Sequence, residues 1–271
     1  VEFLPLFHFH SPRPKIEGSR MTAVASTTST RPEKQLTGLT IRERLRLYLC
    51  CPQCHCSMKA DTSAQTWQCP QCNRIAASHE GQIRCGGFTV SEVKSDWFNR
   101  LKEAVKRRLG TAYQWAIDWI SPVYTGYTKR RIKSYLRSFD LRRELVADLG
   151  SGPLRHSDNL LCCDGVNYDN VDLVTDLEQL PIAGNSCDGL ISIAVLEHVT
   201  DPRAHVAEMA RILKPGGRVL CLIPFLQGYH ASPYDFQRFT SSGMRHLFKD
   251  FEILNLEPGD GPTSALIWTF Q

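Results

Sequence analysis

The sequence lacks the features that mark membrane-spanning and exported proteins. No stretch approaches the roughly 20 consecutive apolar residues that a helix needs to cross a bilayer. The opening VEFLPLFHFH has no preceding basic residues and no small-residue cleavage site, so it is a poor signal peptide. A strong excess of one charge is also missing, because the formal net charge is only +4, and this alone does not argue for nucleic acid. These absences predict a cytoplasmic protein without a transmembrane segment.

What is present is an ordinary globular composition with many cysteines. The chain has 271 residues, of which 42% are hydrophobic and 22% charged, enough to bury a core. In a reducing compartment its 11 cysteines are more often metal ligands than disulfides. We expect four regions. They are a disordered tail, a cysteine-rich module, a basic helical segment and an alternating strand–helix domain, over residues 1–39, 40–89, 90–144 and 145–271.

The first 20 residues differ from the rest, being polar and turn-rich after the opening apolar stretch. We expect Met21 to be the natural first residue and the Ser- and Thr-rich residues after it to be a disordered lead-in. An ordered N-terminal arm is the alternative.

The segment from 90 to 144 is helical and basic. Apolar residues at helical spacing predict a helix over 97–109, and two more are expected over 113–120 and 129–141. Lysines and arginines, among them Lys106, Arg107 and Arg131, give the segment a positive excess. This indicates either a solvated face covering a sheet or a platform for RNA.

The last region alternates apolar strand-like runs with amphipathic helices. Continuous apolar runs such as GLISIAVL are typical of strands buried on both faces. The pattern predicts an α/β fold whose mostly parallel sheet has helices on both faces. Strands are expected over 145–149, 160–163, 172–174, 189–193, 218–223 and 251–256, and helices over 202–213 and 241–248.

Glycines and carboxylates follow successive predicted strands of this region. Gly150 and Gly152 end the first strand, where glycine lets the backbone approach a ligand closely. Asp164 ends the second and could accept hydrogen bonds from ribose hydroxyls, and Asp176 ends the third. Alone, the Gly-x-Gly could be a structural turn and each Asp a turn residue or helix cap, but their joint placement favours a nucleoside pocket.

The stretches VADLGSG, DLEQLPIAGNSCDGLISIAVLEHVTDP and ARILKPGGRVL resemble the class I S-adenosylmethionine-dependent methyltransferases of the type 11-like group. The resemblance implies a Rossmann-like, seven-stranded sheet with one antiparallel edge strand, and S-adenosyl-L-methionine as cofactor. Leu154 stands where a third glycine is usual. The implied cofactor-binding residues are Asp148, Gly150, Ser151, Gly152, Asp164, Asp176, Leu177, Ala194 and Val195.

The cysteine-rich module carries two CPQC elements separated by 14 residues. Two such pairs at this spacing predict a closed, structural Zn²⁺ site made by Cys51, Cys54, Cys69 and Cys72. Redox pairs or unliganded thiols are the alternative. The module resembles the zinc ribbon at the front of certain rRNA guanine methyltransferases and the small zinc-ribbon activator of tRNA and protein methyltransferases.

Candidates for acceptor chemistry lie at two places. Glu197 and His198 follow the fourth strand, and the loop after the fifth strand holds His230, Asp235 and Arg238. This loop resembles the YDFWRFT element of a methyltransferase subgroup, with Gln in place of the commoner Trp. We expect His230 to act as acid/base or to position the acceptor, and Asp235 and Arg238 to order the loop. A structural lid, with Glu197 and His198 in local packing roles, is the alternative.

The predicted function is methyl transfer to a small-molecule, lipid-linked or glycan-type hydroxyl or amine. The alternatives are an RNA methyltransferase that holds rRNA or tRNA with the ribbon and basic helices, and a catalytically inactive S-adenosylmethionine-binding module. The acceptor and the oligomeric state are left open. The chain stops where the resemblance implies a last strand, which predicts a truncated C-terminus.

Overall fold

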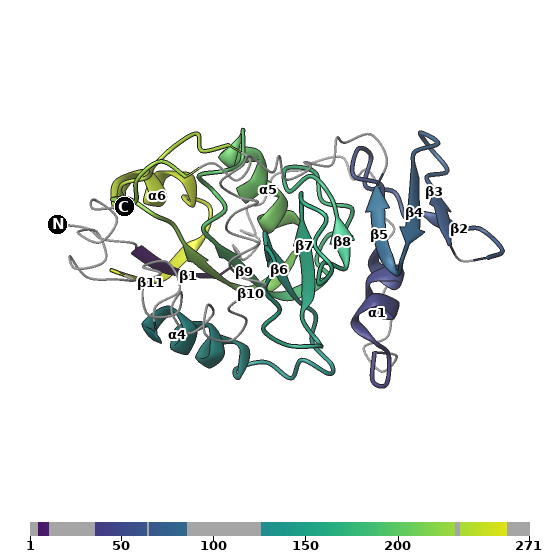
Figure 1. Cartoon of the computed structure of the whole chain (residues 1–271), viewed down its shortest axis with the longest axis horizontal. Helices are drawn as coiled ribbons and strands as arrows, with labels where there is room; N and C mark the ends of the chain where they lie inside the picture. Colours follow the sequence, from purple (N-terminus) through teal and green to yellow (C-terminus); the bar gives the residue numbers. More distant parts are fainter. Residues whose placement is uncertain (1–4, 11–35, 64, 86–125, 231–233, 259–271) are drawn as a thin grey trace, which may run out of the picture.

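A computed structural model describes residues 5–10, 36–63, 65–85, 126–230 and 234–258. Their strands form one 11-stranded sheet in the order β11-β1-β10-β9-β6-β7-β8-β5-β4-β3-β2 (Figure 1). The strands are β1 Pro5–His10, β2 Lys59–Ala60, β3 Thr66–Gln68, β4 Ile75–His79, β5 Gln82–Cys85, β6 Val146–Leu149, β7 Leu161–Asp164, β8 Leu173–Val174, β9 Cys187–Ile193, β10 Leu213–Leu222 and β11 Glu252–Pro258. The helices are α1 Ile41–Tyr48, α4 Gly126–Leu136, α5 Pro202–Ile212 and α6 Ser241–Leu247.

The middle of the sheet is parallel. Strands β8, β7, β6, β9 and β10 pair in parallel register, and every residue of β6, β7 and β8 is buried. Strands covered on both faces must be apolar on both sides, which is why the sequence shows continuous apolar runs there. The predicted α/β class is confirmed, and the carboxyl ends of these five strands meet at one edge of the sheet.

Helices cover both faces of this parallel part (Figure 1). On one face, α4 packs Ile132 and Tyr135 against Ile191 of β9 and Leu220 of β10. On the other, α5 and α6 pack against Val219 and its neighbours. Successive residues of β10 therefore enter opposite core clusters, as the two-residue period of a strand requires. The two hydrophobic layers hold the strand ends in a fixed relation.

Strand β1 comes from a segment for which the sequence predicted a disordered tail. It lies between β10 and β11 and is antiparallel to both, with Phe7 opposite Cys221 on one side and Leu256 on the other. Among the seven described strands from β8 to β11 in the sheet order, β1 is the only one that runs antiparallel to the others. It is the second strand from the edge, whereas the resemblance implied an antiparallel strand at the edge itself. A six-residue extended stretch can order here because backbone partners flank it on both sides.

The cysteine-rich module extends the same sheet instead of standing apart from it. Ile83 of β5 pairs in parallel with Leu173 of β8. The preceding α1 is attached through Arg44, whose side chain is only 2% exposed and donates to the carbonyls of Leu141 and Arg142 at 2.8 and 2.5 Å. The module and the parallel strands thus share one hydrophobic cluster.

Several expected segments lie outside the described residues. These are the helices over 97–109 and 113–120, most of the residues before 36, and everything after 258. Helix α4 begins before the expected residue 129 and ends at Leu136, because the chain then turns into β6 through hydrogen bonds at Asp140. None of the helices in the described part is long and apolar enough to span a membrane.

Candidate active site and cysteine cluster

The predicted site residues follow the carboxyl ends of the parallel strands. Gly150 follows β6, Asp164 ends β7, Asp176 follows β8, and Ala194 follows β9. Because these strands are parallel neighbours, the residues after them are brought to the same edge of the sheet. His230 approaches this edge from the loop that follows β10.

The glycine turn after β6 is held in a conformation that requires glycine at its first position. Gly150 has a φ of 81°, and a Cβ there would lie 2.3 Å from Cγ2 of Val195. Gly152 also has a positive φ, 57°, but a Cβ would meet nothing within 4 Å. Space therefore exists above Gly152 for a ligand to approach the backbone.

Asp164 is oriented by the turn it faces. Its two carboxylate oxygens accept hydrogen bonds from the amides of Gly152 and Val166, both at 2.8 Å. Burial raises the pKa of Asp164, and the backbone donors oppose that rise. The side chain is 9% exposed, so its remaining lone pairs can meet ribose hydroxyls at the sheet edge.

Asp148 lies deeper, within β6. It is 3% exposed, and burial together with the nearby Asp164 carboxylate raises the pKa of Asp148 to about 7. It thus sits below the glycine turn, and Ser151 of that turn is also buried.

The turns after β8 and β9 complete the edge. Asp176 accepts a hydrogen bond from the amide of Glu178 at 2.8 Å, and Leu177 packs against the core. Ala194 has a φ of 55°, an uncommon conformation for a residue with a Cβ and one that clusters at functional sites. It directs Val195 back over the glycine turn.

A polar cluster is formed by Glu197, His198 and His230. Glu197 is fully buried, and neither carboxylate oxygen has a hydrogen-bond partner among the described residues. Nε2 of His198 lies 3.8 Å and Nε2 of His230 3.7 Å from Oε1 of Glu197. The two rings meet edge to face with centroids 5.0 Å apart. The structure thus brings together residues that are 33 positions apart in the chain.

The loop that carries His230 is ordered by its own ion pair. Arg238 contacts both oxygens of Asp235, the second at 2.7 Å, and this pairing lowers the pKa of Asp235 to about 2. Asp235 accepts from the backbone amide of His230 at 2.8 Å. Burial lowers the pKa of His230, but Glu197, the Gly228 carbonyl and Asp235 outweigh it, so the net shift is upward.

Two residues that support this edge were not predicted from the sequence. The side-chain amide of Asn170 donates to the carbonyls of Gly152 and Leu154, each at 2.9 Å. That of Gln237 donates to the carbonyls of Leu196 and Val199 at 3.0 and 3.1 Å. The substitution of Gln for the commoner Trp at position 237 was visible in the sequence, but its partners became visible only in the fold.

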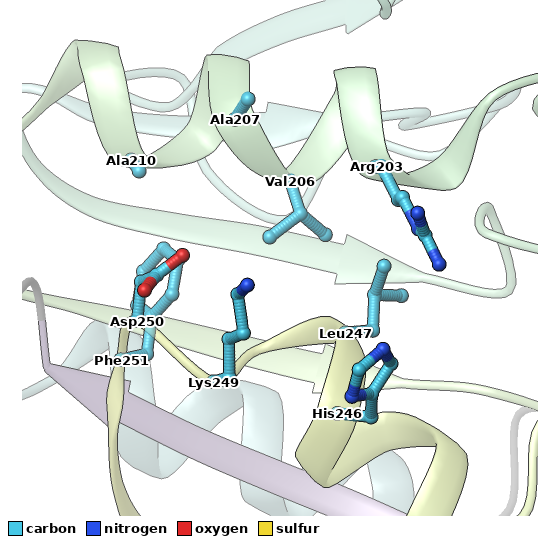
Figure 2. Close-up of a pocket in the computed structure, with 9 residues that line it drawn as sticks. All are labelled: Arg203, Val206, Ala207, Ala210, His246, Leu247, Lys249, Asp250 and Phe251. Atoms are coloured by element: carbon cyan, nitrogen blue, oxygen red, sulfur yellow. The ribbon is translucent and has the colours of Figure 1, made fainter.

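A separate groove lies between α5 and α6 (Figure 2). Val206 of α5 and Leu247 of α6 point toward each other across it, and Arg203, His246 and Lys249 also line it. It contains none of the residues predicted for cofactor or acceptor.

The four predicted cysteine ligands form a second candidate centre. The Sγ atoms of Cys51, Cys54, Cys69 and Cys72 lie within 4.8 Å of one another. The contacts of Cys51 with Cys72 and of Cys54 with Cys69 measure 3.4 and 3.3 Å. Four sulfurs at about 2.3 Å from one ion would be roughly 3.8 Å apart, so the cluster fits a tetrahedral metal ion.

Comparison with known proteins bears on the parallel half of the sheet. Residues 142–221 match a family model described as a methyltransferase domain. A malonyl-[acyl-carrier protein] O-methyltransferase of Hahella chejuensis is 36% identical over 101 residues, covering 36% of this chain and 32% of the relative. A ubiquinone/menaquinone biosynthesis C-methyltransferase of Saccharophagus degradans is 33% identical over 98 residues, covering 35% and 39%.

A shorter match is to the ubiquinone biosynthesis O-methyltransferase of Dinoroseobacter shibae, 43% identical over 47 residues, covering 17% of this chain and 19% of the relative. The chain thus covers less than two fifths of the length of each of these three relatives.

Among solved structures, a chain from the complex between the Haloferax volcanii Trm112 methyltransferase activator and a methyltransferase matches with a TM-score of 0.38 at 20% identity, covering 59% of this chain and 76% of that one. A Haemonchus contortus phosphoethanolamine N-methyltransferase matches with a TM-score of 0.35 at 15% identity, covering 54% and 43%.

Proposed function

We propose that this chain, whose residues 142–221 match a methyltransferase-domain family model, transfers a methyl group from S-adenosyl-L-methionine to a hydroxyl or amine of a small-molecule, lipid-linked or glycan-type acceptor. The observation that carries the proposal is the position of the Glu197–His198–His230 cluster. It lies at the same sheet edge as the glycine turn, next to where the donor would be held.

The glycine turn and the strand-end carboxylates would hold the cofactor. The open space above Gly152 admits it to the backbone, Asp164 would accept from ribose hydroxyls, and the Asp176–Leu177 turn would face the adenine. Ala194 and Val195 would border the methionine end. Asp148 and Ser151 lie buried beneath, where they support the turn.

Bound S-adenosyl-L-methionine supplies an activated methyl group on a sulfonium sulfur. The group would supply a methyl that the acceptor's lone pair takes in line with the bond to sulfur, whose electron pair would remain on sulfur. The protein's part is alignment and the exclusion of water. An acceptor hydroxyl must also lose its proton, which His230 would accept or transmit to solvent.

The relatives favour oxygen as the acceptor atom. Two of the three proteins described above are named as O-methyltransferases, one acting on a malonyl group carried by a protein and one in ubiquinone biosynthesis. The polar cluster suits such an acceptor, because buried carboxylate and imidazole groups can orient a hydroxyl.

We also propose that Cys51, Cys54, Cys69 and Cys72 hold a structural Zn²⁺. The sulfur separations agree with a tetrahedral thiolate cage. None of the 11 cysteines is in a disulfide, which agrees with a reducing compartment such as the cytoplasm.

The alternative acceptor is RNA, and one observation favours it. Lys129, Arg130 and Lys133 of α4 are exposed, so the helix presents cations to solvent. Under this alternative, binding of RNA would weaken steeply as salt rises, and a filter-binding series at increasing salt would reveal it. A cofactor-binding module without turnover would instead bind S-adenosylhomocysteine and methylate no acceptor pool.

The test of the cofactor site is calorimetric titration of S-adenosylhomocysteine into the full chain. We expect micromolar binding that Asp164→Ala weakens by about tenfold or more, because each lost charge-assisted hydrogen bond costs about 1.5–3 kcal/mol. The control is Asp169→Ala, at an exposed position between β7 and β8, which should bind S-adenosylhomocysteine like wild type. No binding by folded wild-type protein would refute the assignment of the cofactor site.

The test of the acceptor side is His230→Ala. We expect this variant to bind S-adenosylhomocysteine like wild type and to lose about 100-fold or more in turnover with the true acceptor, the usual scale of acid–base or positioning groups. Full turnover by the variant would exclude a role for His230 in the reaction.

A further inference from the structure

The carboxylate of Glu197 is buried beside two imidazoles but makes a hydrogen bond to neither of them. The side chain is 0% exposed and both oxygens lack a hydrogen-bond partner among the described residues. A buried carboxylate without partners is strongly unfavourable, so such groups are normally paired or coordinate a metal. The nearest cationic candidates are the imidazoles of His198 and His230.

Both imidazoles turn the same ring nitrogen toward Glu197. Nδ1 of His230 contacts the carbonyl of Gly228 at 3.0 Å, and Nδ1 of His198 contacts the carbonyl of Tyr234. A carbonyl can only accept, so Nδ1 donates in each ring, and in the neutral form of either ring Nε2 presents its lone pair to the carboxylate. Metal-binding histidines are typically oriented this way, by donating the other ring N–H to a backbone carbonyl.

The separations fit an ion placed between these groups better than a direct hydrogen bond. The distance from Oε1 of Glu197 to Nε2 is 3.7 Å for His230 and 3.8 Å for His198. Both are longer than an N–H···O hydrogen bond, whose donor–acceptor distance is about 2.7–3.2 Å. Ligand atoms about 2.0–2.2 Å from a metal at tetrahedral angles are about 3.4 Å apart. A contraction of a few tenths of an ångström would bring each imidazole to that separation from Glu197, and the three ligand atoms all lie within 4.8 Å of one another.

We propose that Glu197, His198 and His230 bind a divalent transition-metal ion. Two imidazoles and one carboxylate form a ligand set that leaves coordination positions open. The histidine side chains are 15% and 25% exposed while Glu197 is closed off, so the open positions face outward from the sheet edge. The site differs in kind from the four-cysteine cluster, which has no open position.

The loop after β10 is built to keep this ligand set together. Asp235, paired with Arg238, accepts from the backbone amide of His230. The amide of Phe236 donates to the carbonyl of Glu197 at 2.8 Å, and Gln237 joins the same two loops. The ligand from the loop is thereby fastened to the two ligands that follow β9.

The role of the ion follows if the proposed methyl transfer is correct, and this step rests on that function. A bound divalent ion lowers the pKa of a coordinated hydroxyl, whose proton then passes to water, and holds the oxygen in place. The site therefore favours acceptors whose reacting group can coordinate the ion, and it activates a hydroxyl in particular. With the ion bound, His230 holds the metal and so positions the acceptor, and the proton passes to water instead of to this imidazole.

The experiment starts from the 271-residue chain, in a preparation that elemental analysis shows to carry one zinc per chain. Co²⁺ is titrated into it, and binding is followed by visible absorption. We expect one further ion per chain with a spectrum of nitrogen and oxygen ligation. Glu197→Gln and His230→Ala should weaken Co²⁺ binding by about 100-fold or more. Substituting a residue that only hydrogen-bonds to a metal ligand already lowers metal affinity by roughly 10–100-fold. The matched controls are Glu80→Gln, at an exposed position after β4, and His246→Ala, in the groove between α5 and α6. Both should bind Co²⁺ like wild type.

Thermal melting shows whether each variant is folded, and His198→Gln replaces any that is not. No cobalt uptake by wild type, or uptake unchanged in the cluster variants, would overturn the proposal. S-adenosylhomocysteine binding is measured on the same samples. Its retention when cobalt fails overturns the metal site alone, whereas its loss when cobalt binds overturns the proposed function alone.

Discussion

At the scale of single residues, the candidate site concentrates buried acidic groups. The Asp164 carboxylate disfavours the charge of Asp148, and the buried Glu197 carboxylate has no hydrogen-bond partner among the described residues. Each of these carboxylates reduces the stability of the protein without its ligands. Groups kept at such a cost cluster where a ligand supplies the compensation.

The first prediction concerns Asp148 and pH. Its pKa of about 7 in the folded chain exceeds the unfolded value of about 3.9, so the folded state holds a proton that the unfolded state loses. The contribution of Asp148 to stability is therefore full below about pH 4 and is lost as pH rises to about 7. Without cofactor, we expect the melting temperature of Asp148→Asn to be higher than that of wild type above pH 7 and equal to it near pH 4.

The control is Asp169→Asn, at an exposed position beyond the same strands. A difference between Asp148→Asn and wild type that stays constant from pH 4 to pH 8 would mean that Asp148 does not titrate in this range.

At the scale of elements, the turn after β6 depends on one close approach of backbone and side chain. Gly150 packs on Val195 of the turn after β9, whereas Gly152 faces open space. The sequence shows two glycines of equal appearance. Only the pairing of β6 with β9 distinguishes them.

The second prediction uses this pair. Gly150→Ala places a Cβ 2.3 Å from Val195 at a φ of 81°, whereas Gly152→Ala meets only the strain of its φ of 57°. We expect Gly152→Ala to lower the free energy of unfolding by about 1–2 kcal/mol, the usual cost of a left-handed residue with a Cβ. Gly150→Ala should lower it by at least about 1–3 kcal/mol more, because its Cβ overpacks against Val195. Urea unfolding of both variants measures this, and equal losses would contradict it.

The loop after β10 makes a similar point about elements. Asp235 and Arg238 were predicted to order the loop, and they pair at the sheet edge while Asp235 accepts from the amide of His230. Gln237 then joins this loop to the loop after β9. Loop composition predicted the participants, whereas the partner loop is set by the strand order.

At the scale of the whole molecule, one continuous sheet links the four-cysteine cluster to the candidate active site. The link runs through β5 and β8 and through the buried Arg44 of α1. Because the two share a core cluster, the state of the cysteine cluster should affect the stability of the parallel strands.

The third prediction tests this link. Arg44→Ala would leave the carbonyls of Leu39, Leu141 and Arg142 without their donor, and unsatisfied buried groups cost about 1–3 kcal/mol each before water enters. We expect a loss of about 2–4 kcal/mol in urea unfolding, and faster proteolysis between the module and β6. Exposed Arg46→Ala on the same helix is the control, and an equal, small effect of both variants would show that α1 does not anchor the module.

The sequence by itself determined the α/β class, the two CPQC elements and the order of glycine and carboxylate residues along the chain. These follow from local information, because apolar periodicity and motif spacing are properties of neighbouring residues. Tertiary structure decided the rest. The placement of β1 between β10 and β11, the joining of β5 to β8, and the meeting of Glu197 with His230 depend on which strands pair and on what each side chain finds buried beside it, and no local pattern records those contacts.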